Sequence, residues 1–326
     1  MKYAVTVAGN IVVDTTKYIA AYPQKLELTA IERMEKSIGG SVPNVGIDIC
    51  KLDPSVQVKA VGFVGEDENG TYALNELKKV PNLDISDVLV SGITSFTDVM
   101  TVKSTGERTF FTYKGADSLN TDKTIPYDRL DCGIFHLAYA LLLDGMDRED
   151  PEYGTVMAKT LCEVQKRGIR TSVDVVSENS DRYRKIVIPA LKYTDYFSVN
   201  EMEAERITGV TLVKDGALVE ENVEATLRKL KDLGVKRCTV IHTPSLSCGL
   251  DENDEFVKVP TLKLPKGYIK GSVGAGDAFT AGLLLMLYRG EKLKKAIETA
   301  NIAAAMSLGT PGATDGIIPI DEFKGL

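Results

Sequence analysis

The sequence predicts an α/β fold: a doubly wound, mostly parallel sheet with helices on both faces, and a small β-sheet lid. Two observations support this prediction. Short apolar runs alternate with longer segments of helical periodicity along most of the 326 residues, which is typical of a parallel sheet covered by helices. Two further segments, 15–38 and 94–113, resemble strands that no helix follows. We interpret them as an inserted antiparallel layer, the lid; a pair of edge hairpins is the alternative.

The expected strands are short and rich in β-branched or aromatic residues. In chain order they are Tyr3–Ala8, Val56–Val61, Gly133–Leu137, Arg170–Val175, Tyr196–Val199 and Cys238–Ile241. The expected helices are Pro43–Leu52, Gly70–Lys79, Tyr153–Arg167, Ser180–Leu191, Glu201–Thr208, Glu221–Leu233, Asp277–Tyr288 and Leu293–Leu308. In Glu221–Leu233, for example, Val223, Leu227 and Leu230 recur at helical spacing, and Gly234 follows as a C-cap signal. We see no repeat and no low-complexity linker, so residues 1–326 are expected to form one domain.

The composition narrows the function before any motif is considered. With 39 basic and 46 acidic residues the net charge is −7, which argues against a nucleic-acid partner. Two histidines exclude a His-rich metal site, and no pair of the five cysteines has C-x-x-C spacing. The longest apolar stretch, Ala278–Tyr288, is far shorter than the ~20 residues of a membrane span. We therefore expect a cytoplasmic protein with no membrane contact.

The most informative stretch runs from Lys270 to Phe279, where Gly274, Ala275 and Gly276 precede an apolar helix. Small residues at a helix start leave backbone N–H groups free, and the helix dipole favours an anion there. Asp277 lies in the same place, where a carboxylate would repel a merely bound phosphate. It makes sense as a base that takes a proton from a hydroxyl attacking that phosphate. The alternative is that Asp277 is a simple N-cap.

Two common nucleotide motifs do not fit this stretch. The chain has no G-x-x-x-x-G-K-[ST] string, and Phe279 stands where a dinucleotide fingerprint needs glycine. A second cluster, Ser37–Gly46, contains Gly39, Gly40 and then Asn44 in the first turn of a helix. A tight turn followed by an amide suits hydrogen bonds to sugar hydroxyls. The alternative is a loop followed by an ordinary helix start at Pro43.

Together these residues resemble the ribokinase-like (phosphofructokinase-B) sugar kinases. Gly39-Gly40 with Asn44 is similar to the N-terminal signature of that family, and Gly274–Phe279 is similar to its C-terminal G-A-G-D-x-F signature. Asn200–Glu203 matches the N-x-x-E motif, and Gly9–Asp14 resembles the end of the first strand. The order and spacing hold from residue 3 to about 319, and three motifs in register are more specific than any one.

The resemblance implies a role for each matching residue. Asp277 would be the general base, and the amides of Gly274, Ala275 and Gly276 would form the anion hole for the γ-phosphoryl group of ATP. Substrate-binding residues would be Asp14, Gly39, Gly40, Asn44 and, from the lid, Arg108; nucleotide-binding residues would be Asn200, Thr243, Ser272 and Asn301. Glu203 would help to hold Mg²⁺. The alternatives are ordinary surface or helix-face roles for Arg108, Glu203 and Asn301. The lid would cover the sugar and could form a homodimer contact.

Three departures from the family pattern qualify these roles. Gly271-Ser272 stands where the family usually has Asp-Thr, and that Asp helps to form a monovalent-cation site in many members, so activation by K⁺ is doubtful. Pro244 and Ser247 replace glycines of the usual nucleotide loop.

The two histidines have separate expectations. His242 could touch the nucleotide, and the alternative is an ordinary histidine at a strand end. His136 is expected to be structural.

The resemblance implies ATP-dependent phosphorylation of a hydroxyl on a sugar or sugar-like molecule of the ribose, fructose or ketodeoxygluconate type. A nucleoside kinase of the same fold is the runner-up. Two other classes remain open: a non-catalytic sugar-binding relative, which the changes at Gly271 and Pro244 would suit, and a nicotinamide-dependent oxidoreductase, which the missing fingerprint disfavours.

Overall fold

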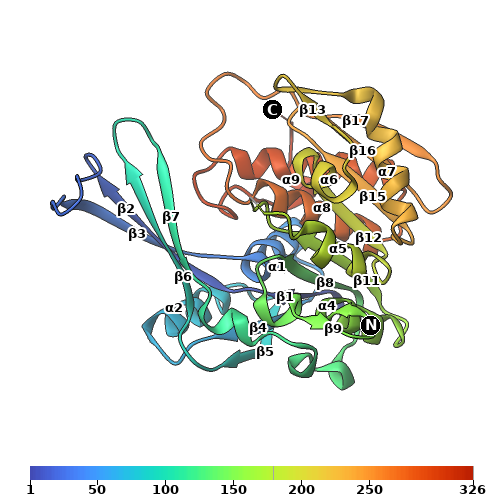
Figure 1. Ribbon diagram of the computed structural model, residues 1–326, viewed down its shortest axis with the longest axis horizontal. Coiled ribbons are helices and arrows are strands. Elements are labelled where there is room, and N and C mark those ends of the chain that lie inside the picture. The colour runs from blue at the N-terminus through green and yellow to red at the C-terminus, as the bar shows by residue number, and fades with distance from the viewer. Residues whose placement is uncertain (179, 326) are drawn as a thin grey trace.

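The computed structural model describes residues 1–178 and 180–325, and Figure 1 shows a main body from which a β lid projects. The body is built on a nine-stranded sheet of order β17-β16-β15-β12-β11-β8-β1-β4-β5. Its parallel strands are β1 (Tyr3–Gly9), β4 (Val58–Val64), β5 (Leu83–Val90), β8 (Cys132–Ala140), β11 (Arg170–Val175), β12 (Tyr196–Asn200) and β15 (Cys238–His242). Two antiparallel strands, β16 (Leu246–Leu250) and β17 (Phe256–Pro260), close one edge.

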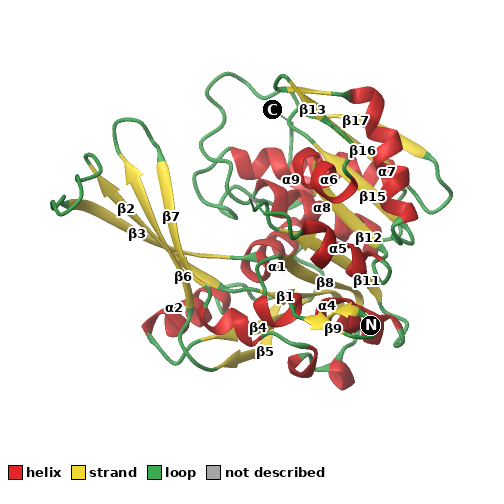
Figure 2. Cartoon of the chain, in the orientation of Figure 1, coloured by secondary structure: helices red, strands yellow, loops and turns green. Residues whose placement is uncertain are grey.

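Helices cover both faces of this sheet (Figure 2), and an apolar core lies under each layer. One core packs beneath α4 (Val156–Gln165), α5 (Tyr183–Leu191), α6 (Glu201–Thr208) and α7 (Val223–Asp232). The other packs beneath α1 (Ser41–Leu52), α2 (Glu68–Leu77), α8 (Ala275–Tyr288) and α9 (Leu293–Leu308). The doubly wound arrangement predicted from the alternating pattern is confirmed.

Three strands of the main sheet were missing from the prediction, and each omission has a physical reason. Strand β5 contains Asp84 and Asp87, and two acidic residues in a short segment argue against a strand in the sequence. In the structure Lys59 on β4 compensates their charge: its Nζ lies 2.8 Å from the Asp87 carboxylate and 3.4 Å from that of Asp84. Strands β16 and β17 form a hairpin that includes Ser247 and Gly249, so their sequence resembled a loop. Strand β16 pairs with β15 on one side and with β17 on the other, so this hairpin extends the sheet.

The lid is a second, four-stranded sheet of order β3-β2-β6-β7. Its strands are β2 (Val12–Ile19), β3 (Ile31–Gly39), β6 (Ser95–Val102) and β7 (Arg108–Tyr113). It differs from the expected antiparallel layer in one respect, because β2 and β6 run parallel and join two antiparallel pairs. Strand β2 starts three residues after β1 ends, and β3 runs directly into α1. The lid is therefore rooted at the carboxyl end of β1.

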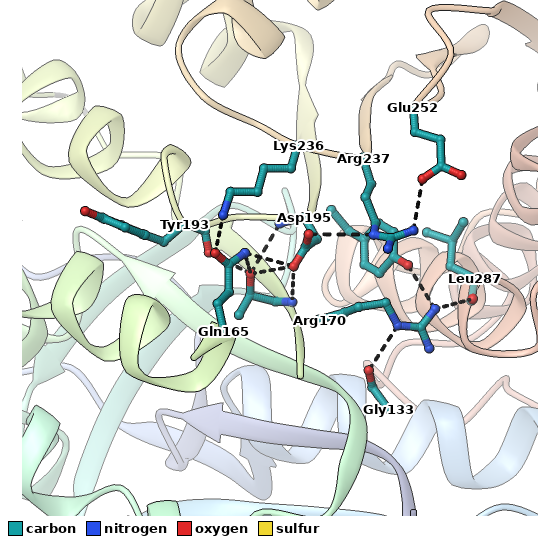
Figure 3. Close-up of polar contacts among 11 residues, drawn as sticks. Gly133, Gln165, Arg170, Tyr193, Asp195, Lys236, Arg237, Glu252 and Leu287 are labelled. Carbon is teal, nitrogen blue, oxygen red and sulfur yellow. Dashed lines mark hydrogen bonds and ion pairs between the residues drawn. The ribbon is translucent and has the colours of Figure 1, made fainter. Parts of the chain in front are cut away.

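A polar network fixes the opposite, amino-terminal edge of the sheet (Figure 3). The Asp195 carboxylate accepts hydrogen bonds from the backbone N–H of Thr171 and from Gln165 Nε2, both at 2.9 Å. Arg170 donates from Nε to the Gly133 carbonyl at 3.2 Å and from Nη1 to the Leu287 carbonyl at 3.3 Å. These contacts join strand starts to helix ends, so this edge is stabilising structure. Separately, none of the helices in the described ranges is long and apolar enough to cross a membrane.

Candidate active site

The candidate site lies at the carboxyl edge of the parallel strands, next to the root of the lid. Asn10 follows β1, Asp174 and Asn200 stand near the ends of β11 and β12, and His242 ends β15 opposite Asn200. Helix α8 begins at this edge with the glycine-rich segment. In open α/β sheets ligands bind outside this edge, where helix N-termini converge.

Asp277 is not the N-cap of α8. That position belongs to Gly274, which has φ +82°, and Asp277 is the third residue of the helix. The N-cap alternative is therefore wrong. A Cβ on Gly274 would lie 2.6 Å from the Ala313 Cβ, so both the left-handed backbone and the close packing require glycine.

The Asp277 carboxylate is held at both oxygens. Tyr139 donates its phenolic hydrogen to Oδ1 at 2.5 Å, and Asn44 donates from Nδ2 to Oδ2 at 2.9 Å. The side chain is buried, and burial raises its pKa to about 6 while the two hydrogen bonds oppose that rise. A carboxylate with this pKa is ionised at neutral pH yet basic enough to accept a proton in a reaction.

The glycine-rich segment presents free backbone donors beside this carboxylate. In the part of the chain that the structure describes, the N–H groups of Gly274, Gly276 and Asp277 have no intramolecular acceptor, whereas Ala278 already donates to the Gly274 carbonyl at 2.8 Å. The predicted set differs by one residue, because the Ala275 N–H faces the Ser272 carbonyl at 3.5 Å and the Asp277 N–H is free in its place. A Cβ on Gly276 would meet nothing within 4 Å. The three donors and the open space in front of Gly276 suit an anion.

The residues predicted to grip the sugar meet at the root of the lid. The Asp14 carboxylate packs over Gly39, where an added Cβ would be 2.5 Å from Oδ2. Gly40 is the N-cap of α1 with φ +91°, and its Cβ would lie 2.6 Å from the Asn10 carbonyl. Asn10 also accepts a hydrogen bond from the Ser41 N–H at 2.9 Å. Burial raises the pKa of Asp14.

Arg108 does not lie beside Asp14. It is exposed at the first residue of β7 and pairs with Thr101, four residues farther out along the lid than Thr97, the partner of Asp14. Four residues of strand span about 13 Å. Arg108 instead lines a surface cavity at the outer end of the lid with Tyr18 and Arg33. Within this chain, the structure does not bring it to the other predicted site residues.

Glu203 and Asn200 sit at the start of α6. The Glu203 side chain is buried, accepts a hydrogen bond from Ser177 Oγ at 2.5 Å, and has a pKa raised by burial. Asn200 donates from Nδ2 to Ser177 Oγ at 3.2 Å. The alternative of Glu203 as an exposed first-turn acid is wrong. Among the described residues, no three His, Cys, Asp or Glu side chains converge to hold a metal ion unaided.

Two residues of the site were missed in the sequence. Asp174 near the end of β11 is a carboxyl whose pKa is raised well above normal by burial and by the nearby charges of Glu203 and Asp277, and Thr280 donates toward it. Tyr139 near the end of β8 contacts Asp277 directly. The sequence did hold a signal for both residues, because each is a polar side chain near the carboxyl end of a predicted central strand. The carboxyl ends of parallel strands meet at one edge of the sheet, where ligands bind.

The predicted nucleotide-side residues are held in different ways. The Thr243 hydroxyl donates to the Leu246 carbonyl at 2.9 Å and closes the β15–β16 turn. Asn301 on α9 is buried and accepts from Ser247 Oγ at 2.7 Å, while its Nδ2 has no partner among the described residues. Ser272 is exposed in front of α8. The His242 ring stacks on Phe279 at 4.6 Å, and burial lowers its pKa to about 4.

Comparisons with known proteins show the family to which the chain belongs. Residues 7–321 match the pfkB family carbohydrate kinase family. The chain is 26% identical to a probable chloroplastic fructokinase-6 of Arabidopsis thaliana over 304 residues (88% of this chain, 74% of the relative). It is also 26% identical to an ATP-dependent 6-phosphofructokinase of Thermoanaerobacterium thermosaccharolyticum over 339 residues (100% and 94%).

Solved structures agree on the fold. An Arabidopsis thaliana ribokinase complexed with ribose and ATP superposes with a TM-score of 0.79 at 22% identity, covering 98% of this chain and 97% of that one. At this identity the superposition shows that the chain has the ribokinase fold, including the lid, and it carries no conclusion about the substrate. The family match over almost the whole length goes further: this chain belongs to the pfkB family of carbohydrate kinases and is a phosphotransferase that acts on a sugar.

Proposed function

We propose that this protein transfers the γ-phosphoryl group of ATP to a hydroxyl of a sugar or sugar-like molecule of the ribose, fructose or ketodeoxygluconate type. The observation that carries the proposal is the pairing at the start of α8. A buried carboxylate with a pKa of about 6 lies on the same helical turn as three free N–H donors. One part can take a proton from a hydroxyl, and the other can hold the phosphoryl group that the hydroxyl attacks.

Asp277 acts as the general base in this proposal. The acceptor hydroxyl donates its proton to the Asp277 carboxylate while its oxygen attacks the γ-phosphorus of ATP, and ADP departs. The N–H groups of Gly274, Gly276 and Asp277 stabilise the charge on the transferring phosphoryl oxygens without needing a lysine. Asp14, Gly39, Gly40 and Asn44 hold the other sugar hydroxyls at the root of the lid, and the lid excludes water.

The residues present also fit Mg²⁺. Asp174 and Glu203 are carboxyls with pKa values raised by burial, and the charges acting on Asp174 are the negative charges of Glu203 and Asp277. A divalent cation would compensate this accumulated charge. Mg²⁺ needs only one or two carboxylates when phosphates and waters complete its shell. Bound there, it would neutralise charge on the ATP phosphates. Asn200, Thr243, Ser272 and Asn301 remain the proposed nucleotide contacts.

The direct test is an ADP-release assay of the purified protein with ATP and Mg²⁺ over ribose, fructose, ketodeoxygluconate and a set of nucleosides. We expect turnover with a sugar, and Asp277→Asn is expected to lower kcat by about 10²–10⁴-fold because the base is lost. ATP binding and the melting temperature of D277N serve as controls for folding. Turnover with nucleosides alone would favour the runner-up. Sugar binding without turnover by the unmodified protein would instead identify a non-catalytic relative.

We also propose that the lid forms a homodimer contact. Phe110 and Phe111, adjacent on β7, are 60% and 55% exposed, so both faces of this edge strand are apolar; Ile31 and Met34 are exposed on the opposite edge strand, β3. A second copy of the same lid would cover such a surface. Light scattering should give the mass of a dimer, and Phe110→Glu with Phe111→Glu should give a monomer. A monomeric unmodified protein would contradict this proposal.

A further inference from the structure

The chain takes an unusual backbone conformation just beyond Tyr139, whose hydroxyl donates to Asp277. Two residues after Tyr139, Leu141 has φ +77°. A branched residue rarely adopts this left-handed conformation, because its Cβ crowds the carbonyl oxygen that follows. Leu141 is also almost completely buried, so its side chain cannot relax toward solvent. Strained residues persist where their surroundings fix them, and they concentrate at functional sites.

Two charged side chains fix Leu141. Its N–H donates to Asp147 Oδ1 at 3.1 Å, and its carbonyl accepts from Arg182 Nη2 at 2.8 Å. Arg182 is itself anchored by Glu178, with Nη2 2.7 Å from Oε2. We call Asp147, Leu141 and Arg182 the Leu141 clamp. It holds both polar groups of one residue just beyond the strand end that carries Tyr139.

We propose that Tyr139 is a positioning residue for the base Asp277, and that the Leu141 clamp holds it in place. This inference rests on the proposed function. Tyr139 and Asn44 donate to different oxygens of the same carboxylate. Two donors at two oxygens fix the rotation of the carboxylate plane, which an aspartate otherwise samples broadly.

A fixed carboxylate matters because each oxygen can accept a second hydrogen bond. The lone pair that remains on Oδ1 or Oδ2 then points in one direction, toward the acceptor hydroxyl. When one donor is lost, the Asp277 carboxylate remains but its orientation toward the acceptor hydroxyl is no longer fixed. A misplacement of the carboxylate by about 1 Å can lower the rate about 10²-fold. Nucleotide binding uses other groups. The expected signature is a lower kcat with an unchanged KM for ATP.

The first test compares two variants that each remove one hydroxyl from a tyrosine of the main sheet. Tyr139→Phe removes the donor to Asp277. The control, Tyr196→Phe, removes a hydroxyl that accepts from Arg170 Nη1 at 3.0 Å in the network at the opposite edge. We expect Y139F to lower kcat by about 10–100-fold with KM for ATP unchanged, and Y196F to retain kcat. Equal kcat values for Y139F and the unmodified protein would overturn the inference.

The second test addresses the clamp. Asp147→Ala removes the acceptor of the Leu141 N–H, whereas Asp147→Asn keeps an acceptor oxygen. D147A should lower kcat, D147N should restore most of it, and Y139F combined with D147A should be no slower than Y139F alone, because both act on one contact. Additive losses in the double variant would show that the clamp does not act through Tyr139. If the unmodified protein phosphorylates no acceptor at all, the proposed function fails instead, so the two failures are distinguishable.

Discussion

Asn200 and Glu203 hold each other in a reciprocal capping box at the start of α6. The Glu203 N–H donates to Asn200 Oδ1 at 2.9 Å, and the Asn200 N–H donates to Glu203 Oε2 at 3.0 Å. The spacing of the N-x-x-E motif is the spacing of this box. The capping box therefore also holds the buried Glu203 side chain at the carboxyl edge of the sheet. Under the proposed function, the complex of Mg²⁺ and ATP binds at this edge.

Glu203→Gln separates these two roles. Glutamine keeps a side-chain oxygen for the Asn200 N–H but removes the negative charge, so the melting temperature should stay close to that of the unmodified protein. The Mg²⁺ concentration for half-maximal activity should rise several-fold, because one anionic partner is lost. Titration of the reaction with Mg²⁺ measures this. An unchanged requirement would leave Glu203 with the capping role alone.

The pH dependence of kcat/KM should report the ionisation of the base. Burial raises the pKa of Asp277 to about 6, and only the ionised form accepts a proton. The rate should therefore be level above pH 7 and fall about tenfold per unit well below pH 6. The groups facing Asp277 are Tyr139, Asp174 and Asp48, and the pKa of each is raised. A profile that stays flat down to pH 5 would argue against Asp277 as the base.

Two glycines of the proposed anion hole should respond differently to replacement by alanine. Gly274→Ala forces a Cβ against Ala313 and strains a left-handed residue, so both the melting temperature and the activity should drop. Gly276→Ala meets nothing within 4 Å, so the fold should be unaffected. Its methyl group nevertheless occupies open space on the residue that carries one of the free N–H donors, so we expect KM for ATP to rise. Equal melting temperatures for the two variants would show that Gly274 is not structurally required.

Replacing K⁺ by tetramethylammonium should not change the rate. Gly271 has no side chain, so this position supplies no carboxylate to pair with a cation. The carbonyl oxygens of Thr310 and Pro311 lie 3.1 Å from where a Cβ on Gly271 would be. The same C-terminal loop is tied to α1 by Lys51, whose Nζ donates to the Thr314 carbonyl at 2.8 Å. Lys51→Met removes this link between the loop and α1, so it should lower the activity, and added K⁺ should not restore it. Strong stimulation of the unmodified protein by K⁺ would contradict this prediction.

Asp117 should make the protein less stable as the pH rises. It accepts from the Ile11 N–H at 3.0 Å, and burial raises its pKa from 3.8 to about 8. A carboxyl with a raised pKa contributes stability that is fully present below pH 3.8 and is lost as the pH rises through about 8. Asp117→Asn keeps the acceptor and cannot ionise. The difference in melting temperature between Asp117→Asn and the unmodified protein should therefore shift in favour of the variant as the pH rises from 5 to 9. A difference that stays constant over this range would show that Asp117 does not have a raised pKa.

The sequence was most informative where local chemistry is tied to chain position. Gly40 and Gly274 lie at helix starts with positive φ, and glycine at these points could be expected from the turns alone. Asn44 and Asp277 were both identified, but not that they touch, because 233 residues separate them. Tyr139, Asp174 and the Leu141 clamp depend on which strands are neighbours in the sheet. No local pattern encodes that order.

Arg108 illustrates the opposite case. Its charge and its place on the lid suggested a substrate contact, but the register of β6 and β7 places it at the outer end. Register is set by pairing across the whole sheet, and a shift of a few residues decides whether a side chain lies at the root or at the tip. The exposed polarity of the lid strands leaves that register unreadable in the sequence.

The root of the lid also limits how relatives can be recombined. Asn10 joins the two chain segments that enter and leave the β2–β3 half of the lid. Its side-chain oxygen accepts from the Ser41 backbone N–H at 2.9 Å, and its carbonyl accepts from the Val42 N–H at 3.2 Å. The segment that follows β3 is the one that carries Asn44 to the Asp277 carboxylate. A chimera that exchanges the β2–β3 half of the lid must therefore be cut outside residues 10 and 44. A junction placed at the strand ends would combine the grafted strands with an Asn44 that was not selected to contact this Asp277.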